Sequence, residues 1–296
     1  MRFANPIYDS VFKHLMEDLE IARGFIGRLL GVKVVELQLL PQELTERKAA
    51  SLGTPDPLVR VFRLDFAAVV ELEDGRRFKV LVELQKALAS EAVGRFRTYL
   101  GKHYAKPPVS TNQPGGSETL PIIAIYLLGF SLGEDIPKVV RVQRRYLNAV
   151  TRQALPEGVK SNFLEKLTHD AVAVQIPLLD DHADTEMERA LIVFDQRRRE
   201  DNPHFLALKD GEIQGADDPL LRQMLLTLLK VASDEETQKQ MDVEDEVLGY
   251  AERLQEAQRA AQEERRLKEE ECRLKEEALS KLAEMEAKLR RLENRE

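Results

Sequence analysis

The spacing of apolar residues along the chain predicts alternating helices and strands. Residues 9–16 and 18–30 carry apolar side chains at helical spacing, and Gly31 ends the second of these helices. An extended run over 32–40 follows, and the glycine and prolines of residues 45–57 predict a loop after it. Further along, the pattern predicts helices over 87–105, 186–199 and 219–232, strands over 121–130, 141–149 and 171–179, and a flexible insertion over 107–118. Because these elements alternate irregularly, we expect a mixed α/β core with helical additions.

Residues 59–86 (VRVFRLDFAAVVELEDGRRFKVLVELQK) predict a β-hairpin, because two β-rich runs flank a short turn sequence. In a loop of three residues the third position adopts the left-handed conformation that favours glycine, and Gly75 occupies that position. Leu72 then pairs with Arg76. The same alignment places Asp65 directly opposite Glu83. A two-residue loop would shift the pairing by one and put these two carboxylates on opposite faces.

The predicted alignment separates the hairpin into two faces. One face is wholly apolar and should be core; it consists of Leu64, Phe66, Ala68, Val70, Leu72, Phe78, Val80, Val82 and Leu84. The other face carries Asp65 and Glu83, with Gln85 one step further along the second strand. The residues nearer the turn on that face are apolar, so the two carboxylates lie at the end of a hydrophobic surface.

Two carboxylates held within one cross-strand spacing repel each other unless a cation lies between them. Such a pair suits a divalent cation with hard oxygen ligands, Mg²⁺ or Mn²⁺, which would activate water and stabilise charge on a phosphoryl oxygen. The alternative is that Asp65 and Glu83 are solvated charges, or that Arg63 and Arg95 neutralise them. The hairpin alone leaves both interpretations open.

Composition narrows the class of protein. In 296 residues, 43% hydrophobic and 32% charged, no stretch reaches the about 20 apolar residues that span a bilayer, and the first residues do not resemble a secretory signal. We therefore expect a cytoplasmic protein without a membrane partner. The single cysteine, Cys272, excludes an internal disulfide and a thiolate metal cluster. The net charge of −8 argues against non-specific coating of nucleic acid but leaves room for a local basic groove.

Residues 245–296 differ from the rest of the chain. They contain 15 acidic and 12 basic residues and no proline, which predicts one long helix. Near its end, apolar residues alternate spacings of four and three as in a coiled coil; these are Ala278, Leu282, Met285, Leu289 and Leu292. Upstream, Leu267 and Leu274 fall outside that register, and Glu271 and Lys275 occupy positions where apolar residues belong. A self-associating coiled coil and a solvated single helix both stay open.

Two other polar clusters each have two interpretations. The arginines at 141, 144, 145 and 197–199 either contact phosphates or are solvated charges. The stretch Asp180-Asp181-His182, with Asp184, is either a second metal site or a polar loop after a strand.

The hairpin resembles the PD-(D/E)XK nuclease superfamily, specifically the Rpn-like recombination-promoting nuclease and transposase family. The superfamily signature is an aspartate on one strand and Glu-x-Lys or Glu-x-Gln on the next, found here as Asp65 and Glu83-Leu84-Gln85. Further resemblances occur in the same order along residues 5–130. They are Asp9, Phe12 and Lys13 in YDSVFKHL, Arg95 and Tyr99 at the Arg-x-x-x-Tyr spacing, and the apolar strand PIIAIYLLGF.

This resemblance implies a restriction-endonuclease-like mixed sheet flanked by helices, and Mg²⁺- or Mn²⁺-dependent hydrolysis of DNA in recombination or mobile-element biology. Asp65 and Glu83 would hold the metal ion. Gln85 would replace the usual lysine and orient water or the scissile phosphate, and Lys13 or Arg95 would supply the missing positive charge. Tyr99 would position the substrate. Asp9 would be an extra carboxylate, although an N-cap of the first helix is the simpler role.

These observations give three expected segments and two functions. Residues 1–180 would form the nuclease-like core, 181–244 a helical extension, and 245–296 the charged helix that joins copies into a homo-oligomer. The first function is a metal-dependent DNA endonuclease. The second is a catalytically degenerate scaffold that binds partners through its terminal helix, since glutamine lacks the charge of lysine. A transposase in the literal sense has less support, because nothing indicates strand transfer.

Overall fold

The computed structural model describes residues 1–40, 66–86, 89–106, 109–110, 117–156, 158–209, 211–213 and 217–293. The chain divides into two compact units, Met1–Asp245 and Glu246–Glu296. The first unit includes both the expected core and residues 181–244. None of the described helices could span a membrane, since each is too short or too polar over the required length.

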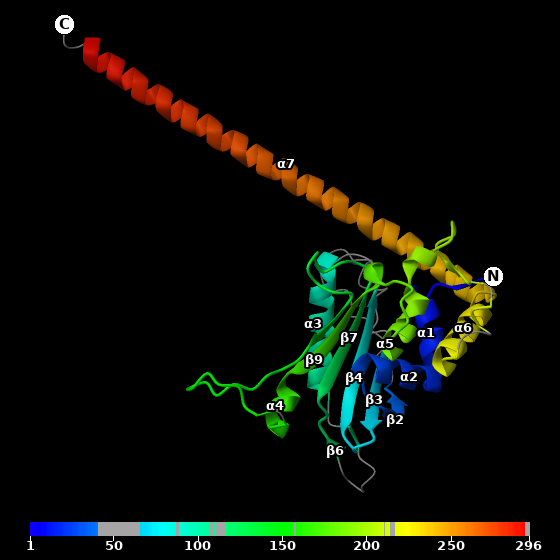
Figure 1. The fold of residues 1–296 in the computed structure, drawn as a ribbon. Coiled ribbons are helices and arrows are strands. Elements are labelled where there is room, and N and C mark those ends of the chain that lie inside the picture. The colour runs from blue at the N-terminus through cyan, green and yellow to red at the C-terminus, as the bar shows by residue number, and fades with distance from the viewer. Residues whose placement is uncertain are drawn as a thin grey trace. The chain divides into compact units, whose positions relative to one another are not determined.

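A mixed β-sheet forms the centre of the first unit (Figure 1). Among the described residues it has six strands in the order β2-β3-β4-β7-β9-β8. They are β2 (Val34–Leu39), β3 (Phe66–Leu72), β4 (Arg77–Gln85), β7 (Ile122–Leu128), β8 (Val139–Val142) and β9 (His169–Gln175). The neighbours β4, β7 and β9 run parallel, and the outer pairs are antiparallel. The expected α/β class with a mixed sheet is therefore confirmed.

Helices cover both faces of this sheet (Figure 1). The helix α3 (Ala89–Ala105) packs on one face. The other face is covered by α1 (Asp9–Glu17), α2 (Leu19–Leu30), α5 (Glu186–Leu191) and α6 (Pro219–Val231). Smaller elements complete the described fold: β1 (Arg2–Ala4) with β10 (Phe205–Ala207), β5 (Val109–Ser110) with β6 (Ser117–Glu118), α4 (Asn162–Leu167), and short 3₁₀ turns at Ile176–Leu178, Ile192–Phe194 and Gln196–Arg198.

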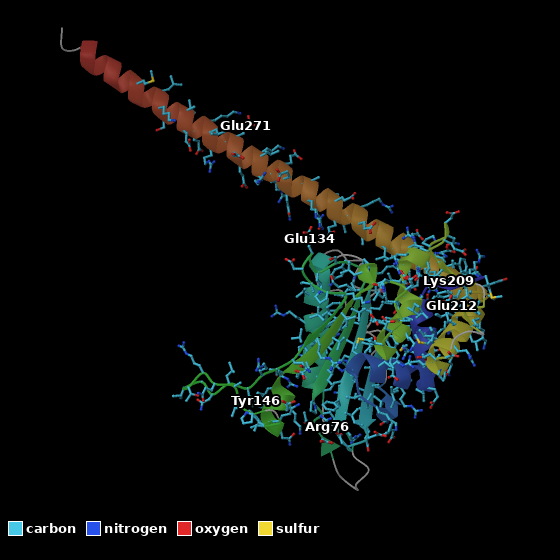
Figure 2. The ribbon with its side chains drawn as sticks, in the orientation of Figure 1. Arg76, Glu134, Tyr146, Lys209, Glu212 and Glu271 are labelled. Carbon is cyan, nitrogen blue, oxygen red and sulfur yellow. The ribbon has the colours of Figure 1, made fainter. Side chains whose placement is uncertain are left out.

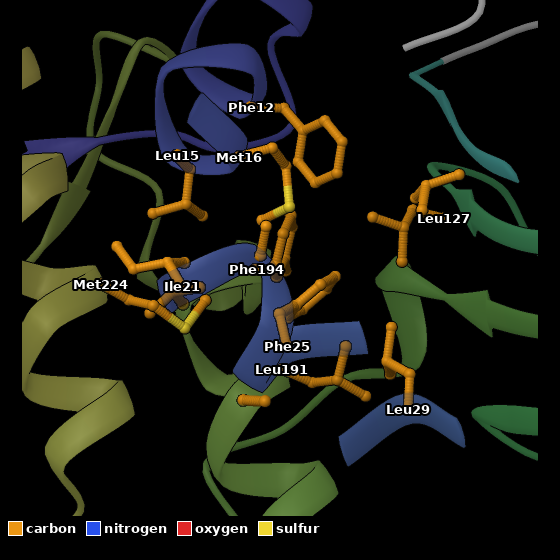
Figure 3. Close-up of a cluster of buried hydrophobic side chains, with 14 of the residues drawn as sticks. Phe12, Leu15, Met16, Ile21, Phe25, Leu29, Leu127, Leu191, Phe194 and Met224 are labelled. Carbon is orange, nitrogen blue, oxygen red and sulfur yellow. The ribbon is translucent and has the colours of Figure 1, made fainter. Parts of the chain in front are cut away.

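The main hydrophobic core lies between the sheet and the four helices α1, α2, α5 and α6 (Figure 3). Phe12, Phe25 and Phe194 meet at its centre, with ring centroids 6.3 and 5.8 Å apart for the two pairs that include Phe194. The start and end of α2 follow the sequence signals, because the Asp18 side chain accepts the first backbone N–H groups and Gly31 adopts φ +65°.

The hairpin of β3 and β4 has the predicted alignment. Phe66 pairs with Val82, and the Leu72 N–H donates to the Arg76 carbonyl at 2.9 Å. Gly75 has φ +77°, as a three-residue loop requires. The predicted core face is confirmed for its described members, which are buried or half-buried against the main core; Leu64 lies outside the described residues.

Two predicted strands are shorter than expected. The strand predicted over 141–149 is β8, which ends at Val142, because the Arg144 N–H donates to the Asp170 side chain instead of continuing the ladder. The strand predicted over 171–179 is β9, which ends at Gln175, because Pro177 lacks a backbone N–H and lies in a 3₁₀ turn.

The helix predicted over 186–199 is interrupted. Its first part is α5, and 3₁₀ turns follow on either side of Asp195. Asp195 is buried, and its carboxylate accepts the Arg197 N–H at 3.1 Å, so a local side-chain bond replaces the helical pattern. The insertion predicted over 107–118 contains the pair β5 and β6, and the loop predicted over 45–57 lies outside the described residues.

The long terminal helix is confirmed as α7 (Glu235–Glu293), a single uninterrupted helix that begins before the change in composition. Its first turn is capped by Asp234, whose carboxylate accepts the Thr237 N–H at 2.8 Å.

Gly129 fixes the end of β7 against the end of β4. Its N–H donates to the Gln85 carbonyl at 2.7 Å, and a Cβ on it would lie 2.1 Å from the Lys86 carbonyl oxygen.

We expect Gly129→Ala to lower the free energy of unfolding by about 1–3 kcal/mol, because backbone must move to admit the methyl group. Urea denaturation measures this. Gly94→Ala on α3, where a Cβ meets nothing within 4 Å, is the control and should be neutral or stabilising; equal effects would contradict the close approach.

Candidate functional site

The candidate site lies on the face of β4 that points toward α3. Lys79, Leu81, Glu83 and Gln85 alternate along the strand and share this face, because side chains of a strand point to opposite sides in turn. Glu83 is 3% exposed and Gln85 is 4% exposed. A carboxylate and an amide are therefore held side by side beneath α3, as the period of two in the sequence predicts.

Tyr126 of β7 is the neighbour of Glu83 across the parallel pair of strands. Its ring stacks on Phe96 of α3, with centroids 4.7 Å apart and planes 29° apart. Burial, followed by the negative charge of Glu83, raises the pKa of Tyr126 to about 12. The phenol thus stays protonated at neutral pH beside the carboxylate. The position of Tyr126 beside Glu83 was not predicted, because Tyr126 lies within an apolar strand.

Glu83 and Gln85 lie near the carboxyl edge of the parallel strands. Gln85 is the last residue of β4, and its backbone carbonyl accepts the Gly129 N–H that follows β7. Ligands of open α/β sheets bind outside the carboxyl ends of the strands. The position of this pair in the sheet is therefore one where binding sites occur.

Several predicted site residues fall outside the described part of the chain. Asp65 lies outside it, as does Arg63, and the side chain of Arg95 is not described. The described pairing of β3 with β4 begins at Phe66 and Val82, so the pair Asp65–Glu83 stays a prediction. Tyr99 is described on α3, half-buried, with the Lys102 ammonium 6.0 Å from its ring centroid.

Asp9 and Lys13 form an ion pair with each other on α1. That helix packs on the sheet face opposite Glu83, through Val11 and Phe12. The expectation that Asp9 is the N-cap is wrong. Tyr8 is the N-cap residue, and the Glu244 carboxylate accepts the backbone N–H groups of Asp9 and Ser10, both at 2.9 Å.

A polar cluster around Asp245 joins the start of α1, the end of β4 and the first part of α7. Asp245 accepts from the Tyr8 hydroxyl at 2.8 Å and the Lys86 ammonium at 2.5 Å, and its Oδ2 lies 3.0 Å from His204 Nε2. The Lys86 ammonium also lies 3.4 Å from the Tyr8 ring centroid. Sequence reasoning missed this cluster, although Tyr8 and Lys86 directly adjoin the motif residues Asp9 and Gln85.

Burial and hydrogen bonding together set the pKa values of this cluster. It lowers the pKa of Lys86 despite the opposing effect of Asp245, and it raises the pKa of Tyr8. Burial alone would raise the pKa of Asp245, but the bonds from Lys86 and Tyr8 outweigh it and hold that pKa below its ordinary value. The cluster therefore links the start of α1 and the part of α7 that lies in the first unit, residues 235–245, to the carboxyl edge of the sheet.

The side-chain oxygens of Glu83 and Gln85 can be compared with the ligands that the predicted metal ion prefers. Mg²⁺ and Mn²⁺ prefer hard oxygen ligands, and the Glu83 carboxylate and Gln85 amide oxygen are such donors on one face. In the ranges that the structure describes, no group of three or more His, Cys, Asp or Glu residues could hold a metal ion. The chemistry of Glu83 and Gln85 fits the ion, and Asp65 is needed as the second carboxylate.

The other polar clusters of the sequence are engaged within the fold. Arg144 donates to Asp170 and Glu165, and Arg141 donates to the Leu29 carbonyl at 2.9 Å. Asp180 binds Lys138, whereas Asp181 binds Arg197 and Lys209. The two aspartates thus pair with different cations, which favours the polar-loop interpretation of this stretch.

Comparisons with protein-family models, with curated proteins and with solved structures gave no match.

Proposed function

We propose that this protein is a metal-dependent DNA endonuclease of the PD-(D/E)XK type, with a restriction-endonuclease-like fold. The observation that carries the proposal is the placement of Glu83 and Gln85 on one face at the carboxyl end of a central parallel strand. The described hairpin alignment supports it, because extending that alignment by one position predicts Asp65 opposite Glu83.

Each residue has a distinct task in this proposal. Asp65 and Glu83 hold Mg²⁺ or Mn²⁺, which when bound lowers the pKa of water and stabilises charge on the phosphoryl oxygen. The Gln85 amide orients the attacking water or the scissile phosphate. Tyr126 keeps its proton beside Glu83, so it adds no second negative charge next to the carboxylate. Arg95 would supply the positive charge that glutamine lacks, and Tyr99 would position the substrate.

Plasmid cleavage with Mg²⁺ and with Mn²⁺ tests this function. The wild type should nick or linearise the plasmid, and Asp65→Ala should lose that activity because one metal ligand is gone. Glu73→Ala is the control, since it removes an exposed carboxylate from the turn of the same hairpin and should cleave normally. No cleavage with either metal, or equal cleavage by Asp65→Ala, would count against an endonuclease.

The scaffold function is the second candidate, and the burial of Glu83 and Gln85 favours it. Side chains that are 3% and 4% exposed offer little surface to a phosphodiester, and glutamine lacks the charge of the usual lysine. Calorimetric titration with Mn²⁺ separates the two functions. An endonuclease should bind the ion in a manner that depends on Asp65 and Glu83, whereas a scaffold should show no such dependence.

A further inference from the structure

The unit Glu246–Glu296 carries a continuous stripe of seam positions along α7. We define the seam by alternating spacings of three and four residues, which extend without a break from Val247 to Leu292. Its members are Val247, Tyr250, Leu254, Ala257, Ala261, Glu264, Lys268, Glu271, Lys275, Ala278, Leu282, Met285, Leu289 and Leu292. The two ends of the seam are apolar, and its four central positions are charged. This is the heptad pattern of a coiled coil with a polar centre.

The middle of the seam is open to solvent. Every seam residue from Ala257 to Met285 is exposed, with Leu282 at 55% and Met285 at 62%. Within the helix, Lys268 pairs with Glu264 and Lys275 with Glu271, both at 2.6 Å; Figure 2 labels Glu271 on this helix. A long helix with an apolar stripe normally gains its stability by packing that stripe against a partner.

The charges decide how a second copy would fit. The seam has two kinds of position, and they alternate. The first kind repeats every seven residues from Val247, and its two charged members are Lys268 and Lys275. The second kind repeats every seven residues from Tyr250, and its two charged members are Glu264 and Glu271. In a parallel pair like positions face each other, so lysine would face lysine or an apolar residue at every register. In an antiparallel pair the first kind faces the second, so lysine can face glutamate.

One antiparallel register pairs every charged seam position with an opposite charge and every apolar seam position with an apolar one. It sets Lys268 against Glu271 of the second copy and Lys275 against Glu264 of the second copy. All other layers are then apolar: Ala261 with Ala278, Ala257 with Leu282, Leu254 with Met285, Tyr250 with Leu289, and Val247 with Leu292. A shift by one heptad leaves charged residues facing apolar ones, which is costly. We propose that two copies of this chain pair through α7 as an antiparallel coiled coil, with the two-fold axis between Glu269 and Glu270.

This register also accounts for Leu267 and Leu274. Both are exposed and lie just before a lysine of the seam, outside the seam itself. In an antiparallel pair the positions that flank the seam on this side meet each other, so Leu267 lies beside Leu274 of the second copy. The contact occurs twice by symmetry and shields the central charged layers. The two Glu246 residues, where the helices leave the first units, would be roughly 70 Å apart.

Disulfide trapping tests the orientation in the full-length chain. In a Cys272→Ser background, Ala261→Cys and Ala278→Cys are prepared separately, oxidised alone, and oxidised as a mixture. The antiparallel register brings position 261 of one copy to position 278 of the other, so only the mixture should give a disulfide-linked dimer. Two copies of position 261 would lie roughly 25 Å apart, too far for a bond. Efficient crosslinking of either variant alone, or none in the mixture, would overturn the proposal.

Charge reversal tests the central layers by sedimentation equilibrium of the full-length protein. Lys268→Glu and Glu271→Lys should each raise the dimer dissociation constant by about tenfold or more, because like charges then face each other. An equimolar mixture of the two variants should restore the wild-type value. Arg273→Glu, an equal charge change on the outward side of α7, is the control. A wild type that stays monomeric, or single variants that dimerise as well as the wild type, would overturn the proposal.

Discussion

Replacing Asp218 with alanine is expected to lower the free energy of unfolding by about 3–5 kcal/mol, the range for breaking a buried ion pair. The Asp218 side chain is 8% exposed and binds two arginines. Its Oδ1 accepts from Arg28 at 2.8 Å, and its Oδ2 accepts from Arg189 at 2.9 Å. Oδ1 also accepts the Leu221 N–H at 3.0 Å and so caps α6. Alanine would leave two partly buried cations and a helix terminus without their acceptor.

Urea denaturation of the wild type and Asp218→Ala measures this loss. The control is Asp217→Ala, because Asp217 is exposed beside it and should change stability by no more than about 0.5 kcal/mol. If both variants lost stability equally, the two arginine contacts would not account for the effect.

Acidification gives a second readout of the same carboxylate. Burial opposes ionisation of Asp218, but bonds from Arg28, the Leu221 N–H and Arg189 outweigh it and hold the pKa below the ordinary value of 3.8. A carboxyl with a lowered pKa contributes stability that is present above its unfolded pKa and is lost as the pH falls through the folded one. The difference between the wild type and Asp218→Asn should therefore be constant above about pH 5 and shrink below pH 3.8.

The hairpin of β3 and β4 shows what the sequence alone can predict. Gly75 defines the loop length, the loop length defines the pairing, and the alternation of side chains then defines which residues are core. These are local rules, and they also place Glu83 beside Gln85 on one face. The ends of α2 follow from equally local signals, Asp18 and Gly31.

The features that could not be predicted depend on contacts between distant residues. Tyr126 meets Glu83 because β4 and β7 pair in parallel, and the register of a parallel pair follows from how the connecting helix α3 packs on the sheet rather than from a turn. Lys86 and Asp245 are 159 residues apart in sequence. The break in the helix at Asp195 likewise depends on burial of its side chain, which composition does not show.

If the proposed endonuclease function holds, Glu83→Gln should reduce metal-dependent DNA cleavage by about a thousandfold. The variant keeps the size of the side chain on β4 but removes the negative charge that would bind the ion. A bound metal ion supplies several kcal/mol of charge stabilisation, and each 1.36 kcal/mol is a factor of about ten in rate. Single-turnover cleavage of a plasmid at saturating Mg²⁺ measures the effect.

Glu71→Gln is the matched control for this variant. Glu71 lies in the same hairpin, pairs with Arg77 and is half-exposed, so its change removes one carboxylate without touching the candidate site. Calorimetric titration with Mn²⁺ should show weakened binding for Glu83→Gln and normal binding for Glu71→Gln. A Glu83→Gln protein that folds, binds Mn²⁺ and cleaves like the wild type would remove Glu83 from the proposed site. If Glu83→Gln lost cleavage but still bound Mn²⁺, Glu83 would act on the substrate and would not be a ligand of the ion.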